Sequence, residues 1–344
     1  MNKVKVGVAG LGRQGYGMHG TGLVKLNDEF QIVAACDLIE ERRKRYQELT
    51  GCRVYESFEK LLADDEVELI IIATYSKDHC DHIIRALGAG KNVYGEKPFC
   101  LNYEEACRIR DAAKTASGKL FIGQNRRFEG DFIKLREIMD SGVLGEIYEI
   151  QHSVFHYNRR DDWQTLQDMG GGQLYNWGPH LIDHALQLMD APVVSMTSCL
   201  RQIAAVGDAE DHVDIGLTGA NGRSIRLEIG GGVAMQFPKY IVYGTKGTAI
   251  YQDEHFTLKY LDPQKPLEPR VAIRESVMDT FGTEEDLPFI QETIHAPMGD
   301  LMEIMHCVYR SLRQGEAFPV SIDEAVEVMR IITGAKTGVL PQKQ

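Results

Sequence analysis

The chain has 344 residues, of which 43% are hydrophobic and 26% are charged, and this composition suits a globular protein of two domains with a sizeable core. Its formal net charge of -12 at pH 7 argues against a nucleic acid or an anionic membrane as the partner, because both bind basic surfaces. We therefore expect a small-molecule partner.

The seven cysteines are scattered, odd in number and without CxxC spacing, which indicates reduced thiols rather than a disulfide framework or a zinc site. His295, His306 and Cys307 also lack the spacing of metal ligands, so we expect no metal. The first residues lead directly into a strand, and no apolar run approaches the length that spans a membrane. The sequence therefore predicts a cytoplasmic protein.

Short apolar strands alternate with helices through residues 1–123. Strands are predicted at 4–9, 31–36, 53–55, 69–73, 92–94 and 120–123, and helices after the first strand and at 40–50, 57–64, 79–89 and 103–117. Continuous apolar strands between helices are typical of a parallel sheet covered on both faces. The pattern predicts an α/β, doubly wound Rossmann domain over residues 1–123.

The first strand is followed by GLGRQG at 10–15. In such a segment the first glycine permits the sharp turn into a helix, the second lets the backbone approach a pyrophosphate, and the third allows close helix packing. The helix N-terminus then faces the anion. The segment predicts a dinucleotide site that includes Gly10, Leu11, Gly12, Arg13 and Gln14.

Asp37 ends the second strand, at the distance from the glycines where a carboxylate accepts hydrogen bonds from both ribose hydroxyls. The same carboxylate opposes a 2′-phosphate, so we expect NAD rather than NADP. Arg42 and Arg43 could reach such a phosphate, but Glu40 and Glu41 precede them, and a solvated helix face is the simpler interpretation.

After a predicted helix at 131–140, the pattern changes to longer strands that look antiparallel. They are predicted at 147–155, 193–203, 211–218, 224–229, 234–244 and 247–251, followed by a surface loop at 262–269 and helices at 299–314 and 322–337. Apolar and polar residues alternate along 213–217 and 225–229, so one face of the sheet should pack on helices and the other should be free. We expect a C-terminal α+β domain over 124–344 that forms a homodimer or homotetramer through apolar residues of these strands.

The segment at 170–183 leads into a helix with two distinct faces. One face is apolar and consists of Leu174, Trp177, Leu181, Ala185 and Leu188. The other is a polar row, in which helical spacing aligns Asn176, His180, Asp183 and Gln187. Such a row could look into a cleft.

Several motifs occur in a fixed order: GLGRQG, Asp37, ATYSKDH at 73–79, GKNVYGEKP at 90–98, GQNRRF at 123–128, GGGQLYNWGPHLID at 170–183 and YGTKGTA at 243–249. In this order and spacing the chain resembles the Gfo/Idh/MocA family of nicotinamide-dependent oxidoreductases over nearly its whole length. The resemblance implies a Rossmann domain followed by a mostly antiparallel sheet domain whose open face commonly builds oligomers.

The resemblance also assigns the chemistry. It implies that Lys97 contacts the substrate oxygen and the nicotinamide ribose, and that His180 is the catalytic histidine. Pro98 restricts the residue before it to extended geometry, which helps to aim Lys97 out from the end of a strand. A neutral imidazole suits the removal of a proton from an alcohol. The matching segments further place at the cofactor Thr74, Tyr75, His79, Glu96 and Arg126.

Asn176 departs from the family pattern, because many of its sugar and inositol dehydrogenases carry aspartate there. The amide removes a negative charge from beside His180 and Lys97, which Asp183 could partly restore.

Two further residues are candidates for the substrate side. Asn125 ends a strand near the nicotinamide, and Trp163 could stack on a sugar face or fill the domain junction. For Arg127, a position on the surface is as good an interpretation as one near the nicotinamide.

These features predict reversible hydride transfer between NAD and a secondary ring alcohol of a sugar, glycoside or inositol, with His180 as base and Lys97 stabilising charge on the same oxygen. A neutral substrate is favoured because a 2-hydroxy acid calls for an arginine clamp, and no arginine lies in the helix that bears His180. Two alternatives are redox-assisted cleavage of glycosides with NAD and a non-catalytic NAD sensor or co-repressor. The sensor would not need Lys97 and His180.

Overall fold

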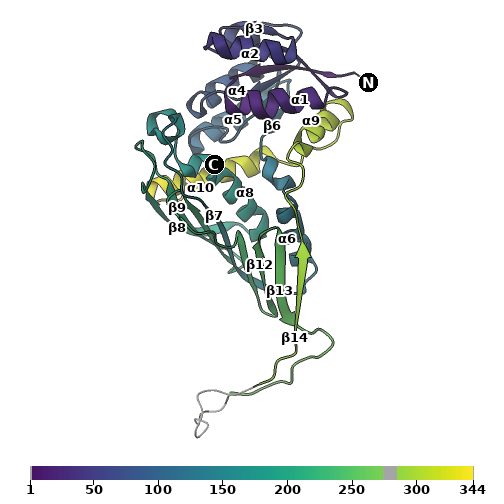
Figure 1. Ribbon diagram of the computed structural model, residues 1–344, viewed down its shortest axis with the longest axis vertical. Helices are drawn as coiled ribbons and strands as arrows, with labels where there is room; N and C mark the ends of the chain where they lie inside the picture. Colours follow the sequence, from purple (N-terminus) through teal and green to yellow (C-terminus); the bar gives the residue numbers. More distant parts are fainter. Residues whose placement is uncertain (1, 273, 275–284, 344) are drawn as a thin grey trace.

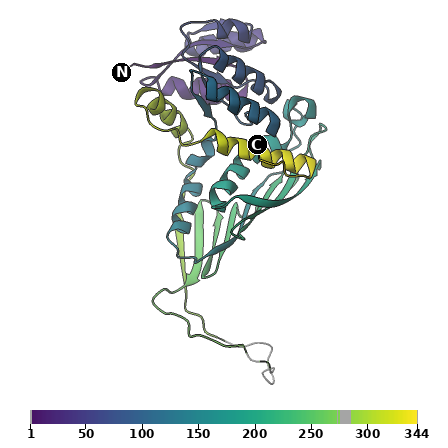
Figure 2. The ribbon, with the colours of Figure 1, turned by 180° about the vertical axis from the view of Figure 1, so that it is seen from behind.

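The computed structural model of the chain describes residues 2–272, 274 and 285–343. Their strands form two sheets that follow one another along the long axis of the molecule, with helices between them (Figure 1). Helix α10 (Ile322–Thr337) crosses the middle and contacts α5 (Tyr103–Thr115) on one side and β8 (Val193–Arg201) on the other. The back view shows the same crossing (Figure 2).

The first sheet is parallel, and its strand order is β3-β2-β1-β4-β5-β6. Its strands are β1 (Val4–Ala9), β2 (Phe30–Cys36), β3 (Arg53–Tyr55), β4 (Leu69–Ile72), β5 (Asn92–Gly95) and β6 (Leu120–Ile122). The connecting helices are η1 (Arg13–Gly20), α1 (Thr21–Lys25), α2 (Glu40–Thr50), α3 (Phe58–Leu62), η2 (Ser76–Asp78), α4 (His79–Gly88) and α5. The central strands β1 and β4 are almost wholly buried, as continuous apolar strands require. The predicted doubly wound α/β sheet is confirmed.

The order of this sheet reverses between β1 and β4. Connections leave the carboxyl ends of these two strands in opposite directions, and the divergence opens a crevice in which doubly wound proteins bind their ligands. The glycine-rich loop leaves β1 at this point and continues into η1, which is a π-helix rather than an α-helix.

The second sheet has the order β14-β13-β12-β11-β7-β10-β9-β8. Its strands are β7 (Ile147–Phe155), β8, β9 (His212–Gly219), β10 (Ser224–Gly230), β11 (Tyr240–Gly244), β12 (Gly247–Gln252), β13 (His255–Leu261) and β14 (Phe289–His295). β7 and β10 are parallel, and the other neighbouring pairs in the described part of the chain are antiparallel. The mostly antiparallel second sheet is therefore confirmed.

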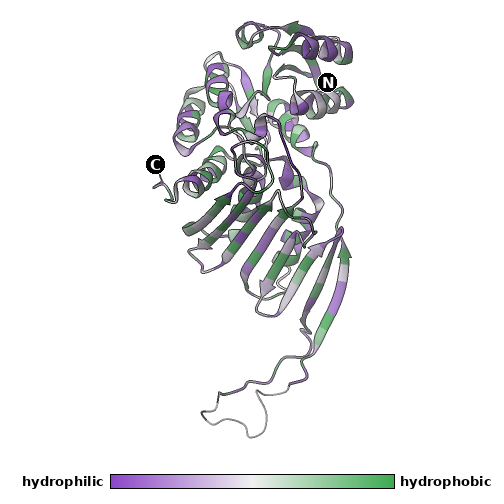
Figure 3. Cartoon of the chain, turned by 60° about the vertical axis from the view of Figure 1, so that its left-hand side comes forward, coloured by the Kyte–Doolittle hydropathy of each residue, from purple (hydrophilic) through white to green (hydrophobic). Residues whose placement is uncertain are grey.

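Helices cover one face of the second sheet, with α8 (Gly178–Met189) on β10 and α10 on β8. Hydrophobic and hydrophilic residues alternate along the strands (Figure 3). The apolar residues of β9, Val213, Ile215 and Leu217, are buried and face the helices. Helix α8 is anchored to the sheet by His184, whose Nδ1 lies 2.9 Å from the hydroxyl of Tyr240.

Two strands of this sheet are missing from the sequence prediction, and one is shorter than expected. β13 buries Phe256, Leu258 and Tyr260 in a regular alternation that the prediction overlooked. β14 is the edge strand of the described sheet and pairs there with β13, and its mostly exposed side chains give it no alternating pattern. The strand predicted from residue 234 begins at Tyr240, after Pro238, which has no amide hydrogen to donate to a sheet.

Helix α9 (Glu303–Arg313) belongs spatially to the first sheet, although it comes late in the sequence. Its Ile304, Met305 and Val308 join one buried cluster with Val4 and Val6 of β1. Arg313 fixes this arrangement through two contacts of 2.6 Å with the carboxylate of Glu68. Among the described residues, no helix combines the length and apolar character needed to cross a membrane.

Candidate active site

A cleft of about 600 Å³ lies at the carboxyl end of the first sheet. It collects residues from the ends of β1, β2, β4 and β5, together with residues 162–164 of the loop that follows β7. The predicted site residues that line it are Gly10, Gly12, Arg13, Gln14, Asp37, Thr74, Tyr75, His79, Glu96, Lys97 and Trp163. This position agrees with the crevice created by the reversal of strand order.

The glycine-rich loop is shaped for a dinucleotide. Gly10 has a φ of +86°, and a Cβ there would lie 2.5 Å from the carbonyl oxygen of Ala73. A Cβ at Gly15 would lie 1.8 Å from the carbonyl oxygen of Gly10, so side chains are excluded at both positions. Gly12 lines the cleft, and a Cβ there would come no closer than 3.8 Å to Nη1 of Arg42, so the backbone is accessible to a pyrophosphate. The residues present therefore fit a dinucleotide cofactor.

Asp37 ties the end of β2 to this loop. Its Oδ2 accepts a hydrogen bond of 2.7 Å from the amide of Leu11, and its Oδ1 accepts one of 2.9 Å from the amide of Ile39. Leu11 itself is buried and contributes through this amide.

Arg42 and Arg43 do not form the solvated helix face that we expected. Nη1 of Arg42 lies 3.6 Å from Oδ2 of Asp37, and its side chain lines the cleft. Arg43 donates instead to the backbone carbonyls of Asp37 and Leu38. Because the cleft has both a carboxylate and a guanidinium at the ribose end, the geometry alone fits NAD and NADP.

Lys97 follows β5, and its peptide bond to Pro98 is cis. Its Nζ donates a hydrogen bond of 2.9 Å to the carbonyl oxygen of Asn176. Burial lowers the pKa of Lys97 from 10.5 to about 8; Glu96 opposes this shift, and Arg126, Arg13 and Arg160 add to it.

His180 lies in the first turns of α8, beyond Trp177, at which the helix predicted as continuous divides into α7 (Gln173–Asn176) and α8. Burial lowers the pKa of His180 well below its usual value, and the charge of Lys97 adds to the effect. Burial therefore favours the neutral form of the imidazole, which has a lone pair to receive a proton, while the lowered pKa makes it a weaker base. The structure thus joins Lys97, which lines the cleft, to Asn176, whereas Asn176 and His180 are not among the residues that line it, and their roles stay predictions.

The loop before α7 closes over the cleft from the side of the second sheet. The indole of Trp163 meets the ring of Tyr75 edge to face, with 5.2 Å between ring centroids. Arg13 of the glycine-rich loop donates a hydrogen bond of 3.0 Å to Oε1 of Gln164. Trp163 accordingly borders the cleft and contacts the N-terminal domain through Tyr75, and its stacking on a sugar stays a prediction.

His79 braces the cleft from within α4. Its ring nitrogens lie 2.6 Å from the carbonyl oxygen of Pro98 and 3.1 Å from that of Thr74. The imidazole therefore connects the loop after β4 to the loop that carries Lys97.

Asn125 and Arg126 lie in η3 (Asn125–Phe128), after β6, and neither lines the cleft. The guanidinium of Arg126 covers the face of Trp177 at 4.2 Å and pairs with Glu129. The amide of Asn125 approaches the sulfur of Met18 at 3.7 Å. Their predicted contacts with substrate and cofactor remain predictions.

The placement of Asp183 beside the substrate is wrong. Its carboxylate is buried and receives two hydrogen bonds from Arg127, of 2.6 and 2.8 Å. Arg127 is therefore a buried ion-pair partner and not a surface residue. Nε2 of Gln187 likewise donates a hydrogen bond of 2.8 Å, to Glu324 of α10. Asp183 and Gln187 therefore bond to other segments of the chain, and the predicted polar row does not face one cleft.

The sequence interpretation missed several polar residues of this region. Gln164 and Arg160 belong to a loop without regular pattern, and Lys239, which binds Glu129 at 2.7 Å, lies far from it in sequence. His19 was missed although it lies in η1, directly after the glycine-rich segment, and that position was a usable signal.

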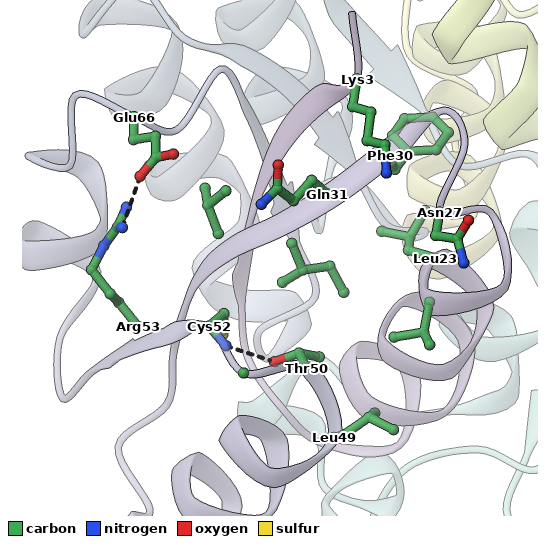
Figure 4. Close-up of a pocket in the computed structure, with 14 residues that line it drawn as sticks. Lys3, Leu23, Asn27, Phe30, Gln31, Leu49, Thr50, Cys52, Arg53 and Glu66 are labelled. Atoms are coloured by element: carbon green, nitrogen blue, oxygen red, sulfur yellow. Dashed lines mark hydrogen bonds and ion pairs between the residues drawn. The ribbon is translucent and has the colours of Figure 1, made fainter. Parts of the chain in front are cut away.

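A second hollow of about 560 Å³ lies at the amino ends of the strands of the first sheet, between α1 and the start of β3 (Figure 4). Its most prominent charged side chains, Arg53 and Glu66, are paired with each other at 2.8 Å. The amide of Cys52 donates to the hydroxyl of Thr50.

Comparison with known proteins agrees with this architecture. Residues 4–124 match the model of the oxidoreductase family with an NAD-binding Rossmann fold, and residues 132–250 match the Gfo/Idh/MocA C-terminal domain. The uncharacterized oxidoreductase YdgJ of Escherichia coli is 30% identical over 285 residues, which cover 79% of each chain. The chain belongs to the Gfo/Idh/MocA family.

Relatives within the Gfo/Idh/MocA family cover nearly the whole chain. The scyllo-inositol 2-dehydrogenase (NADP(+)) IolW of Bacillus subtilis is 27% identical over 97% of this chain and 93% of its own. A solved structure of an NAD-binding protein from Listeria innocua has a TM-score of 0.84 at 26% identity and covers 98% of both chains. The protein is therefore an NAD(P)-dependent oxidoreductase with an NAD(P)-binding Rossmann domain.

Proposed function

We propose that the protein oxidises a secondary ring alcohol of a cyclic polyol or sugar, with NAD as the preferred hydride acceptor. The observation that carries the proposal is the hydrogen bond of 2.9 Å from Nζ of Lys97, which lines the cleft, to the carbonyl oxygen of Asn176, four residues before His180. In this proposal Lys97 is the hydrogen-bond donor and His180 is the base. The similarity to the scyllo-inositol dehydrogenase supports a cyclic polyol.

The roles of the two residues follow from their charges. When bound, the nicotinamide cofactor supplies the hydride acceptor. His180, which is neutral, accepts the proton of the substrate hydroxyl. Lys97 donates a hydrogen bond to the same oxygen and stabilises the negative charge that develops on it.

A neutral ring suits the remaining groups. Asn176 offers an amide, whose Nδ2 lies 3.3 Å from Oε1 of Gln173, and Trp163 offers a flat apolar surface. Three arginines approach this region: Arg126 and Arg160 pair with Glu129 and Asp162, which opposes their use as a carboxylate clamp, and Arg13 bonds Gln164.

A substrate panel tests the proposal. The purified protein is incubated with scyllo-inositol, myo-inositol, glucose and aryl glucosides, each with NAD and with NADP, and reduced cofactor is followed by absorbance. We expect reduction with at least one neutral ring and no release of the aryl group. Turnover of carboxylate-bearing substrates alone would contradict the neutral ring, and release of the aryl group would favour glycoside cleavage.

We also propose that the open face of the second sheet pairs with a second copy of the chain. This face carries Ile250 and Tyr148, both exposed, between polar residues such as Arg226 and Asp214, which bond to each other. The apolar residues that we expected to form the contact face the helices instead, so pairing would use this mixed surface.

A further inference from the structure

A buried histidine–carboxylate pair lies directly behind Lys97. Nε2 of His19 is 2.7 Å from Oε1 of Glu96, and both side chains are almost completely removed from solvent. The second carboxylate oxygen, Oε2, accepts a hydrogen bond of 3.2 Å from the amide of Lys97. One carboxylate thus joins the first helix of the fold to the backbone of the catalytic loop.

His19 reaches Glu96 because of the shape of η1. The π-helical turn carries five exposed or half-exposed positions and turns His19 inward at its end, where the imidazole meets Tyr94 of β5 edge to face. Within the described part of the chain, Nδ1 of His19 has no hydrogen-bond partner. The hydrogen bond to Glu96 is therefore the polar contact that the ring makes there, and π-helical turns are frequent at functional sites.

The charges around the pair favour an ionised Glu96. Burial by itself raises the pKa of Glu96, but the hydrogen bond from His19 and the charges of His19, Lys97 and His79 outweigh it and leave the pKa lowered. The charge of Glu96 raises the pKa of Lys97, whereas the charges of Arg126, Arg13 and Arg160 lower it. His180 of α8 faces Lys97 as well.

We propose that His19 is a positioning residue for Lys97: it holds the Glu96 carboxylate ionised and oriented behind the lysine, and Glu96 in turn keeps Lys97 charged at the cleft. The inference rests on the proposed role of Lys97 as a charged donor to the substrate oxygen. It gives the helix after the glycine-rich loop a second task beyond binding the cofactor. If Glu96 were neutral, the negative charge that opposes the effect of Arg126, Arg13 and Arg160 on Lys97 would be lost.

The test measures the protonation of Lys97 without any substrate. A trace of acetic anhydride acetylates the neutral amine, and mass spectrometry of the Lys97 peptide at a series of pH values gives its apparent pKa. The full-length variants are His19→Ala, His19→Gln, which keeps an N–H donor at the same reach, and Glu96→Gln, which removes the charge. His306→Ala is the matched control, since His306 forms a 2.8 Å pair with Glu29 away from the cleft.

We expect His19→Ala and Glu96→Gln each to lower the apparent pKa of Lys97 by about one unit or more, because a nearby carboxylate shifts a titration by that amount. His19→Gln should recover most of the shift, and His306→Ala should cause none. The double variant His19→Ala with Glu96→Gln should shift it no further than Glu96→Gln alone.

Two results would overturn the proposal. One is an unchanged Lys97 titration in both His19→Ala and Glu96→Gln. The other is a lowered apparent pKa of Lys97 in Glu96→Gln but not in His19→Ala. If the alanine variant does not fold, the corresponding result is that His19→Gln shows the same lowered pKa as Glu96→Gln or fails to recover the unaltered value. Since the readout is chemical labelling, a failure of the proposed sugar oxidation would appear only in the substrate panel and would leave this result intact.

Discussion

The ammonium of Lys97 donates a 2.9 Å hydrogen bond to the backbone carbonyl of Asn176, so the loop after β5 is joined directly to the segment that begins α8. The contact links the cofactor side of the cleft to the substrate side. Because it uses the carbonyl, it does not depend on whether residue 176 is an amide or an acid. An aspartate at position 176 would therefore change the charge of the site and not this contact of Lys97.

Lys97 and His180 should act on one oxygen and therefore as one unit. We expect Lys97→Ala and His180→Ala each to lower kcat by about two orders of magnitude or more, and the double variant to lose little beyond the single ones. Cofactor affinity, measured by fluorescence titration, should change little in His180→Ala. Near-normal turnover of His180→Ala would show that another group is the base.

The rate should depend on pH through Lys97. Its pKa is lowered to about 8, so the charged donor is present below that pH and is lost as the pH rises through it. We expect kcat to decrease as the pH rises through about 8, which gives the pH–rate profile an alkaline limb. Lys97→Arg should be slower but should lack the limb, because a guanidinium stays charged throughout. A limb of the same position in Lys97→Arg would assign it to another group.

The preference between NAD and NADP should be set by Asp37 and Arg42 in opposite directions. We expect the unaltered protein to bind NAD more tightly, Asp37→Ala to narrow the difference, and Arg42→Ala to weaken NADP more than NAD, since the guanidinium lies 3.6 Å from the carboxylate. Isothermal titration with both cofactors measures this. Tighter binding of NADP to the unaltered protein would refute the preference.

The ion pair of Asp183 with Arg127 should stabilise the fold. Asp183→Asn leaves a buried guanidinium short of its partner, and we expect a loss of about 3 kcal/mol in the free energy of unfolding. Asp81→Asn is the control, because its pair with Arg85 is exposed and should contribute less than about 1 kcal/mol. Urea unfolding compares the two. An equally small effect at both positions would indicate that Asp183 is dispensable for stability.

Assembly should depend on the open sheet face. We expect a dimer or tetramer in sedimentation at micromolar concentration, which Ile250→Lys weakens by placing charge on that face. Val339→Lys introduces the same charge at an exposed position near the C-terminus and should have no effect. A monomeric unaltered protein would rule out the proposed pairing.

The sequence was sufficient for the first sheet and the glycine-rich loop because their signals are local. Continuous apolar strands, spaced glycines and an acidic residue after β2 all act within short stretches. Helix α8 was also recognisable from its apolar face, although its break at Trp177 was not.

What could not be predicted depends on contacts between distant segments. Asp183 sits on a helix face that suggests a cleft, but Arg127, 56 positions earlier, occupies both of its oxygens. The pair of His19 and Glu96 spans 77 positions and is invisible to any periodicity. Such long-range pairs decide which polar side chains remain available for chemistry.

The position of α9 has a consequence for synthesis of the chain. Because Ile304, Met305 and Val308 complete the apolar cluster around β1, the first sheet keeps an uncovered flank while the whole second sheet is being made. The cofactor-binding domain is thus the first to be synthesised, but its apolar cluster is complete only after the second sheet has been made. A ribosome-bound fragment ending before α9 should expose that flank to chaperones, and maturation of the dinucleotide site should await the return of this helix.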